Sequence, residues 1–178
     1  MRKRDAFTLV ELLTVIAVIA ILAAISFGIT TGVYQRQART EAEAELAGIA
    51  TALESYRKQY GTYPITSDEE EMLQALANRL KWVDESTTEE IDSGRPFLDP
   101  GKFDVSGLSD GDDFDGDGQL LVDPWGNEYQ YEFSVGNSWK RFGYVLYSNG
   151  PDGTSVAPTN GIIDKDSAAN ADNIYIGE

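Results

Sequence analysis

Hydrophobic residues fill the first third of the chain in two successive patterns. From Leu12 to Gln35 no charged side chain occurs, and about 24 helical residues would span roughly 36 Å, more than the ~30 Å of a bilayer core. Beyond this run, apolar residues recur every three or four positions, the period of a helix with one apolar stripe. We therefore predict one helix of about 50 residues, with a stripe made of Val33, Ala38, Ala42, Leu46, Ile49, Leu53, Tyr56 and Tyr60.

Glycine and proline mark where this helix changes or ends. Gly28 and Gly32 either let it bend or locally melt, or allow close helix packing. Gly61 suits the position after the C-cap, and Pro64 cannot continue a helix. A short second helix is expected over residues 67–81, capped by Ser67 or Asp68.

The rest of the chain alternates between irregular and strand-like segments. Residues 82–122 lose periodicity and predict a long acidic loop. Residues 123–147 alternate aromatic and polar side chains, which predicts an antiparallel hairpin with its turn at Gly136 and Asn137. Trp125 is expected to be a core aromatic, and residues 148–178 are rich in turn formers.

Three interpretations compete for the N-terminal segment. A secretory signal has an apolar region of about 7–15 residues, which is shorter than the run seen here. A plain membrane anchor fits the length, and Arg2, Lys3 and Arg4 would then stay cytoplasmic. That anchor leaves Glu11 unexplained, because an acid in the apolar zone costs a few kcal/mol. The third interpretation is cleavage just before Phe7 with retention of the apolar helix.

Ala6 followed by FTLVELLTVIAVIAILAAI resembles the class III leader and first helix of type IV pilins and of the pseudopilins of type II secretion. The resemblance implies that a prepilin peptidase cuts between Ala6 and Phe7, although the family usually has Gly in place of Ala6. It also implies N-methylation of Phe7 and pairing of Glu11 with a subunit's terminal amine during assembly. An α-amino group with a pKa near 8 can neutralise a carboxylate in low dielectric.

Two later segments resemble the major pseudopilins in particular. YGTYP closes the long helix, and DPWGNEYQY over residues 123–131 matches a family segment in which Trp125 would contact that helix. The tail resembles the family ending S-x-G-x-D-G followed by D-A-D-I, which implies one structural calcium ion. This chain departs from it by a long spacer and by Asn170 in place of an acid. The implied ligands are Ser148, Asp152, Asn170 and Asp172, with Asp166 as a substitute.

A second calcium loop is a separate possibility. Asp113, Asp115, Asp117 and Gly118 reproduce the first half of a D-x-D-x-D-G loop. The twelfth position is Pro124, with Asp123 one residue earlier, so the segment is either an ion site or a solvated acidic turn. Its candidate ligands are Asp113, Asp115, Asp117, Gln119 and Asp123.

Composition excludes several function classes. The formal charge is -16, and the leader MRKRDA carries three basic and one acidic residue, so its removal leaves -18. Such an acidic chain is a poor ligand for nucleic acid and a good one for cations. The sequence contains no cysteine and no histidine, which excludes a disulfide framework, a zinc-thiolate site and a Ser-His-Asp triad. We do not expect an enzyme.

Together these features predict an α+β, pilin-like fold whose long N-terminal helix packs on a small antiparallel sheet beside a calcium-ordered C-terminal loop region. The expected divisions are a cleaved leader (1–6), a transmembrane assembly helix (7–34) and a periplasmic domain (35–178). Within that domain we expect the second half of the helix (35–60), a short helix (67–81), an acidic loop (82–122), a hairpin (123–147) and the C-terminal loop (148–178).

The predicted function is that of a structural subunit. It would leave the bacterial inner membrane, N-terminus cytoplasmic, and polymerise with copies of itself into a periplasmic pseudopilus. The implied partners are prepilin peptidase, minor pseudopilins and an assembly platform with its ATPase. The alternatives are a type IV pilin for adhesion, DNA uptake or motility, and a membrane-anchored calcium-dependent binding module that does not polymerise.

Overall fold

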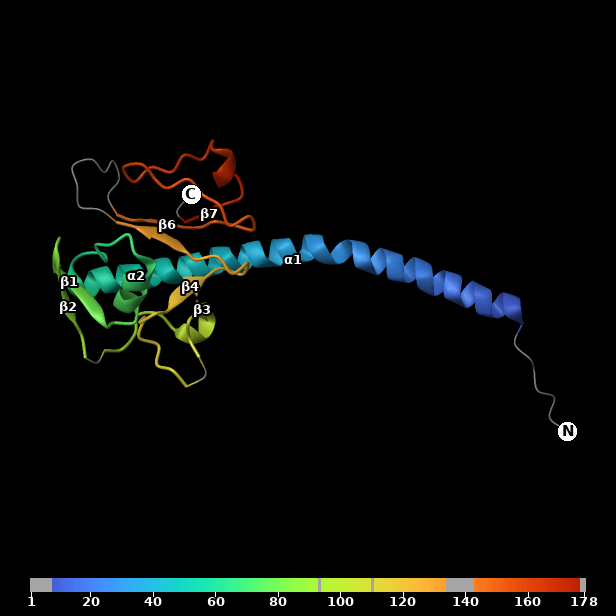
Figure 1. The fold of residues 1–178 in the computed structure, drawn as a ribbon, viewed down its shortest axis with the longest axis horizontal. Coiled ribbons are helices and arrows are strands. Elements are labelled where there is room, and N and C mark those ends of the chain that lie inside the picture. The colour runs from blue at the N-terminus through green and yellow to red at the C-terminus, as the bar shows by residue number, and fades with distance from the viewer. Residues whose placement is uncertain (1–7, 93, 110, 134–142, 177–178) are drawn as a thin grey trace. The chain divides into compact units, whose positions relative to one another are not determined.

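The computed structural model describes residues 8–92, 94–109, 111–133 and 143–176, and it leaves the side chains of 25–31 outside the description. The chain divides into two compact units, one ending at Gln37 and the other beginning at Ala38. The helix α1, Leu9–Tyr60, belongs to both (Figure 1).

Helix α1 is continuous over 52 residues, and its helical backbone runs through Gly28 and Gly32 without a break. In the second unit its apolar stripe is buried as predicted, from Ala38 through Leu46 to Tyr56. Val33 lies outside that stripe and is 57% exposed. The helix ends where the glycine predicts, because Gly61 has a φ of +86° and its N–H donates to the Arg57 carbonyl oxygen.

A short helix and two small hairpins follow. Helix α2 spans Glu69–Leu76, and the predicted cap Asp68 accepts hydrogen bonds from the Glu70 and Glu71 N–H groups. It is shorter than the predicted range 67–81, because residues from Leu80 onward pair in a strand. Strands β1 (Leu80–Asp84) and β2 (Thr87–Glu90) pair antiparallel. After the 3-10 turn η1 (Pro100–Lys102), β3 (Asp104–Ser106) pairs antiparallel with β4 (Leu120–Val122).

The prediction that residues 82–122 form only an irregular loop was therefore wrong. The strands escape sequence analysis because they are three to five residues long, too short to establish an alternating pattern. Strand β2 reads Thr-Thr-Glu-Glu and is exposed along its whole length, so it carries no apolar signal at all.

The third sheet contains the predicted hairpin and the end of the chain. Strands β5 (Gln130–Glu132) and β6 (Val145–Ser148) are antiparallel, with Tyr131 opposite Leu146, and β7 (Ile174–Tyr175) pairs with the other edge of β6. The predicted turn at Gly136 and Asn137 lies outside the described residues. A second 3-10 turn, η2, spans Ala168–Asn170.

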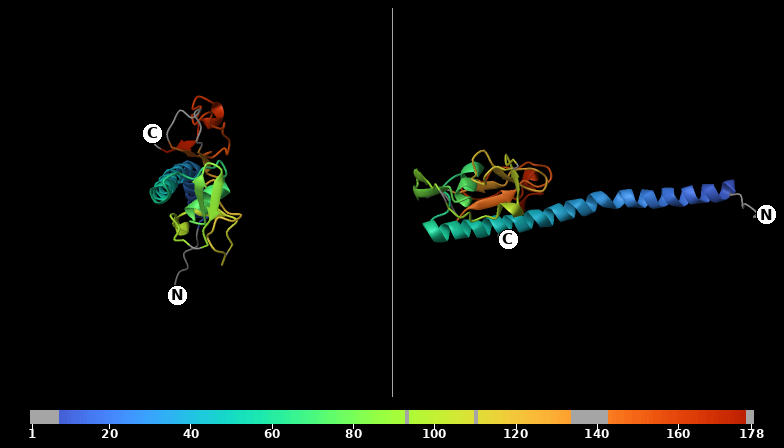
Figure 2. Two further views of the ribbon diagram at one scale, coloured as in Figure 1. Left: turned by 90° about the vertical axis from the view of Figure 1, so that its left-hand side faces the viewer. Right: turned by 90° about the horizontal axis from the view of Figure 1, so that it is seen from below.

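One core joins these elements in the second unit. The buried stripe of α1 packs with α2 and with the inner residues of β4, β5 and β6, and the rest of the unit lies along one side of the helix (Figure 2). Trp125 packs against this core, which confirms its expected role as a core aromatic. Phe103 lies directly over Gly48, since a Cβ there would come within 2.9 Å of its ring. The glycine in the helix interior thus makes room for an aromatic ring.

Candidate functional site

The start of α1 holds Glu11 in a capping box. Thr8 donates to Glu11 Oε2 through its backbone N–H at 2.9 Å and through its hydroxyl at 2.7 Å. In return the Glu11 N–H donates to Thr8 Oγ1 at 3.3 Å. This reciprocal arrangement satisfies N–H groups that the first helical turn leaves without helical partners. Glu11 thus has a structural role in the single chain, in addition to the pairing predicted for it.

The sequence analysis did not identify this cap, although the spacing was readable. Thr8 and Glu11 stand three residues apart, just before the apolar run, which is the signature of a capping box. Ala6 and Phe7, where cleavage and N-methylation are predicted, lie outside the described residues.

Large apolar side chains surround this end of α1 on every face. From Leu9 to Leu22 their exposed fractions lie between 53% and 78%. The described part of the predicted transmembrane segment 7–34 contains no helix long and apolar enough to cross a membrane. The N-terminal part of α1 is therefore a helix with an extensive apolar surface and one carboxylate, Glu11, near its start.

The predicted calcium ligands of the tail fall into separate polar clusters. The Asp152 N–H donates to Asp172 Oδ2 at 3.3 Å, so these two residues meet. Asn170 is held elsewhere, because its amide donates to the Asp164 carbonyl oxygen and its Oδ1 accepts from the Val156 N–H. Asp166 is exposed, and its N–H donates to Asp164 Oδ1.

Ser148 belongs with Asp123 instead. The Ser148 hydroxyl donates to Asp123 Oδ2 at 2.5 Å, while Asp123 Oδ1 accepts from the N–H groups of Trp125 and Asn127. Asn127 in turn donates to the Gly150 carbonyl oxygen at 2.8 Å. Asp123 is only 1% exposed. Its carboxylate therefore fixes the DPWGN turn and fastens it to the start of the tail.

The other candidates of the second loop form a compact turn against α2. Gln119, which is buried, donates to the Asp113 carbonyl oxygen and to Asp115 Oδ1, and its own Oε1 accepts from the Gly116 N–H. The Asp117 N–H also donates to Asp115 Oδ1. Asp123 is not bonded to this group. Among the described residues, no three acidic side chains gather closely enough to bind a metal ion.

Two further acids of the core face have unusual environments. Burial raises the pKa of the half-buried Glu45 carboxyl, which accepts a hydrogen bond from the Tyr129 hydroxyl. Burial likewise raises the pKa of Glu69, with the carboxylates of Glu128 and Asp68 adding to the rise. The pKa values of both carboxyls therefore lie above that of an ordinary glutamate.

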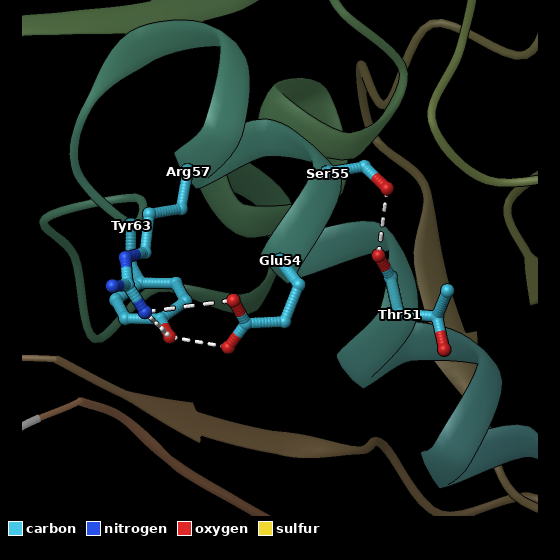
Figure 3. A network of polar contacts seen from close by, with 5 residues as sticks. All are labelled: Thr51, Glu54, Ser55, Arg57 and Tyr63. Atoms are coloured by element: carbon cyan, nitrogen blue, oxygen red, sulfur yellow. Dashed lines mark hydrogen bonds and ion pairs between the residues drawn. The ribbon is translucent and has the colours of Figure 1, made fainter.

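A network of polar side chains lies at the C-terminal end of α1 (Figure 3). Arg57 Nη1 donates to the Tyr63 hydroxyl at 2.8 Å and lies 3.5 Å from Glu54 Oε2. The Tyr63 hydroxyl donates to the other oxygen of Glu54. The network joins the last turns of the helix to the YGTYP segment.

Comparisons with known proteins support the interpretation of the N-terminal segment. Residues 1–27 match the family described as the prokaryotic N-terminal methylation motif. Three curated relatives are each named type II secretion system core protein G. The relative from Pseudomonas aeruginosa is 29% identical over 89% of this chain and 92% of its own length.

The other two relatives give the same result. The protein of Aeromonas hydrophila is 28% identical over 85% of this chain and 86% of its own length, and that of Vibrio cholerae is 27% identical over 86% of each. No solved structure is significantly similar to the chain. The resemblance inferred from the sequence is thereby confirmed: this chain carries the N-terminal methylation motif and, over most of its length, is similar to proteins named type II secretion system core protein G.

Proposed function

We propose that this chain is the structural subunit of a periplasmic pseudopilus in type II secretion. It would be held in the inner membrane by its apolar helix, cleaved before Phe7 and methylated on the new amine. It would then polymerise with copies of itself and with minor pseudopilins on an ATP-driven assembly platform. The role is structural, and no catalytic chemistry is proposed.

The observation that carries this proposal is the combination of the methylation motif with a helix that exposes large apolar side chains on every face and carries one acid, Glu11. An apolar helix that leaves lipid must bury its surface on other protein, and copies of the same helix are the available partners. Similarity over most of the chain to core proteins G favours secretion over a type IV pilin. The same similarity disfavours a membrane-anchored binding module that does not polymerise.

The test must separate assembly from helix capping, because Glu11 is placed to do both. Glutamine can replace glutamate in a capping box, so Glu11→Gln keeps the acceptor for Thr8 and removes only the charge. We expect Glu11→Gln to reach the membrane normally and to be lost from filaments. Thr8→Ser, which keeps the hydroxyl, is the matched control and should assemble. Normal filaments from Glu11→Gln would refute the charge-pairing role.

We further propose that the tail binds calcium through Asp152 and Asp172. The Asp152 backbone N–H contacts Asp172 Oδ2, which places the two residues side by side. Gly150 also approaches Asp172 closely, since a Cβ there would come within 2.6 Å of the Asp172 carbonyl oxygen and 3.3 Å of its Oδ2. Calcium prefers such carboxylate and carbonyl oxygens.

Ser148 and Asn170 are bonded within the protein. Asp152 Oδ1 also accepts from the Thr154 N–H and hydroxyl, but an ionised carboxylate has about four acceptor sites. The two aspartates therefore keep oxygens for an ion and are the centre of the proposal. A bound ion would fix the order of a tail with little apolar content.

A further inference from the structure

The C-terminal end of α1 has a shallow depression on its surface. Thr51, Glu54, Ser55, Arg57, Lys58 and Gly61 line a shallow depression of about 460 Å³, here called the helix-end hollow. It lies on α1 within the second unit, whose other elements cover only one side of this helix (Figure 2). A Cβ at Gly61 would meet no other atom within 4 Å, so the rim is open.

One wall of the hollow is held firmly in place. Arg57 is fixed between Glu54 and the Tyr63 hydroxyl, and its guanidinium carbon lies 5.2 Å from the centre of the Tyr63 ring (Figure 3). Tyr63 is itself packed edge-on against Tyr144, with ring centres 4.9 Å apart. The positive charge of Arg57 is therefore anchored to the core and already partly neutralised by Glu54.

The hydroxyls of the hollow do not supply donors to a ligand. Thr51 Oγ1 donates to the Ala47 carbonyl oxygen at 2.8 Å, and Ser55 Oγ donates to the Thr51 carbonyl oxygen at 2.9 Å. The Arg57 guanidinium is already held by Glu54 and Tyr63. The cation of the hollow without a hydrogen-bond or ion-pair partner in the described parts of the chain is the Lys58 ammonium group. Lys81 and Lys102, by contrast, are paired with Glu89 and Asp99.

We propose that the helix-end hollow binds a carboxylate of a second copy of this chain, through Lys58, within the filament. This rests on the proposed function. After removal of the leader the chain has 11 basic and 29 acidic residues, since the leader contains three of the 14 basic and one of the 30 acidic residues. A neighbouring copy therefore presents mainly carboxylates. Copies that both carry a large negative charge repel each other unless cations at their contacts face acids. Lys58 is a cation available to pair with an acid of a neighbouring copy.

A zero-length cross-linking experiment tests the contact without assuming which acid is involved. The full chain is produced successively in nitrogen-15 and nitrogen-14 medium before assembly is induced, and the filaments are treated with a carbodiimide, which joins a lysine amine to a carboxylate. We expect peptides of mixed isotope content that join Lys58 of one copy to an acid of another. Links from Lys58 only within its own copy, or none, would overturn the proposal.

Charge variants test whether the contact matters for assembly. An exposed ion pair changes an equilibrium by roughly two- to fivefold, so Lys58→Glu should lower the filament yield by about that factor. Lys58→Arg should restore it, and Lys102→Glu makes the same charge change outside the hollow and should have no effect. If the unaltered chain forms no filaments, the proposed function fails. If filaments form equally well with Lys58→Glu, only this inference fails.

Discussion

The Tyr129 hydroxyl donates a hydrogen bond of 2.5 Å to Glu45 Oε2, and so joins α1 to the segment that leads into β5. Tyr129 is fully buried, whereas Glu45 is half-buried on the helix. Burial raises the pKa of the Glu45 carboxyl, the bond from Tyr129 opposes the rise, and the carboxylates of Glu41, Asp104 and Asp123 add to it. The contact between helix and sheet therefore contains a carboxyl that ionises less readily than an exposed glutamate.

The first prediction concerns the dependence of stability on pH. Because the folded-state pKa of Glu45 lies above its ordinary value of 4.5, its stabilising contribution is complete below that pH and is lost as the pH rises through the raised value. Glu45→Gln should remove this part of the loss, so at pH 7 it should be more stable than the unaltered chain. Urea unfolding of the full chain in detergent between pH 4.5 and 7.5 measures this slope, over a range that begins at the ordinary glutamate pKa and extends above it.

Glu43→Gln is the matched control for that measurement, since Glu43 is exposed and pairs with Arg39 at 3.3 Å. It should leave the slope unchanged. Part of the slope should persist in Glu45→Gln, because the pKa values of Glu69 and Glu132 are also raised by burial. A slope identical to that of the unaltered chain would contradict the assignment to Glu45.

The second prediction removes the donor. Tyr129→Phe leaves the Glu45 carboxyl without the hydrogen bond that holds its pKa down. We expect a loss of about 1 kcal/mol in the free energy of unfolding, the typical net value of such a bond. The pH-dependent loss should also extend to higher pH, which the same titration of unfolding would detect. A loss of stability without that displacement would indicate a packing effect alone.

The third prediction concerns Asp123, whose carboxylate accepts three hydrogen bonds while almost fully buried. Asp123→Ala leaves the partly buried N–H groups of Trp125 and Asn127 and the buried Ser148 hydroxyl without their acceptor, and should cost about 2–4 kcal/mol. Thermal unfolding without calcium measures this. Asp117→Ala, at an exposed position, should stay within about 0.5 kcal/mol. Equal effects from the two substitutions would exclude the proposed anchoring role.

The helices were predictable from the sequence because their signals are local and long. The apolar period identified α1, Asp68 marked the start of α2, and Gly61 marked the end of the first helix. Strands β1 to β4 were not predictable, because pairs of three to five residues depend on contacts with distant partners rather than on their own pattern. The hairpin of β5 and β6 was predictable, because aromatic and polar side chains alternate there over a longer stretch than in β1 to β4.

The candidate site divides in the same way. Residues near one another in the sequence, such as Asp113, Asp115 and Gln119, do form one turn. Asp123 was grouped with them by its position, yet β4 separates it from that turn and it bonds to Ser148, 25 residues away. The spacing of acids along the sequence cannot reveal that the Asp123 carboxylate belongs to a different turn, because only the tertiary fold brings Ser148 next to Asp123.

The fourth prediction uses two glycines of the acidic loop, both with positive φ. Gly116 lies against α2, where a Cβ would come within 2.5 Å of the Gln74 backbone nitrogen, whereas a Cβ at Gly111 would meet nothing within 4 Å. Gly111→Ala should therefore cost only the backbone strain, about 1 kcal/mol. Gly116→Ala adds displacement of the loop from α2 and should cost about 2–3 kcal/mol more. Equal losses in thermal unfolding would mean that the loop does not pack on the helix.

The fifth prediction distinguishes the two acidic regions as calcium sites. A ligand that binds only the folded chain stabilises it by about 2.7 kcal/mol at a concentration one hundred times its dissociation constant. Calcium should therefore raise the melting temperature of the full chain, and a chelator should reverse the shift. Asp172→Asn should abolish the rise, because it weakens the site shared with Asp152, while Asp117→Asn should keep it. If Asp117→Asn abolishes the rise and Asp172→Asn keeps it, the ion binds in the loop around Asp115. If calcium does not change the melting temperature of the unaltered chain, neither region is a calcium site.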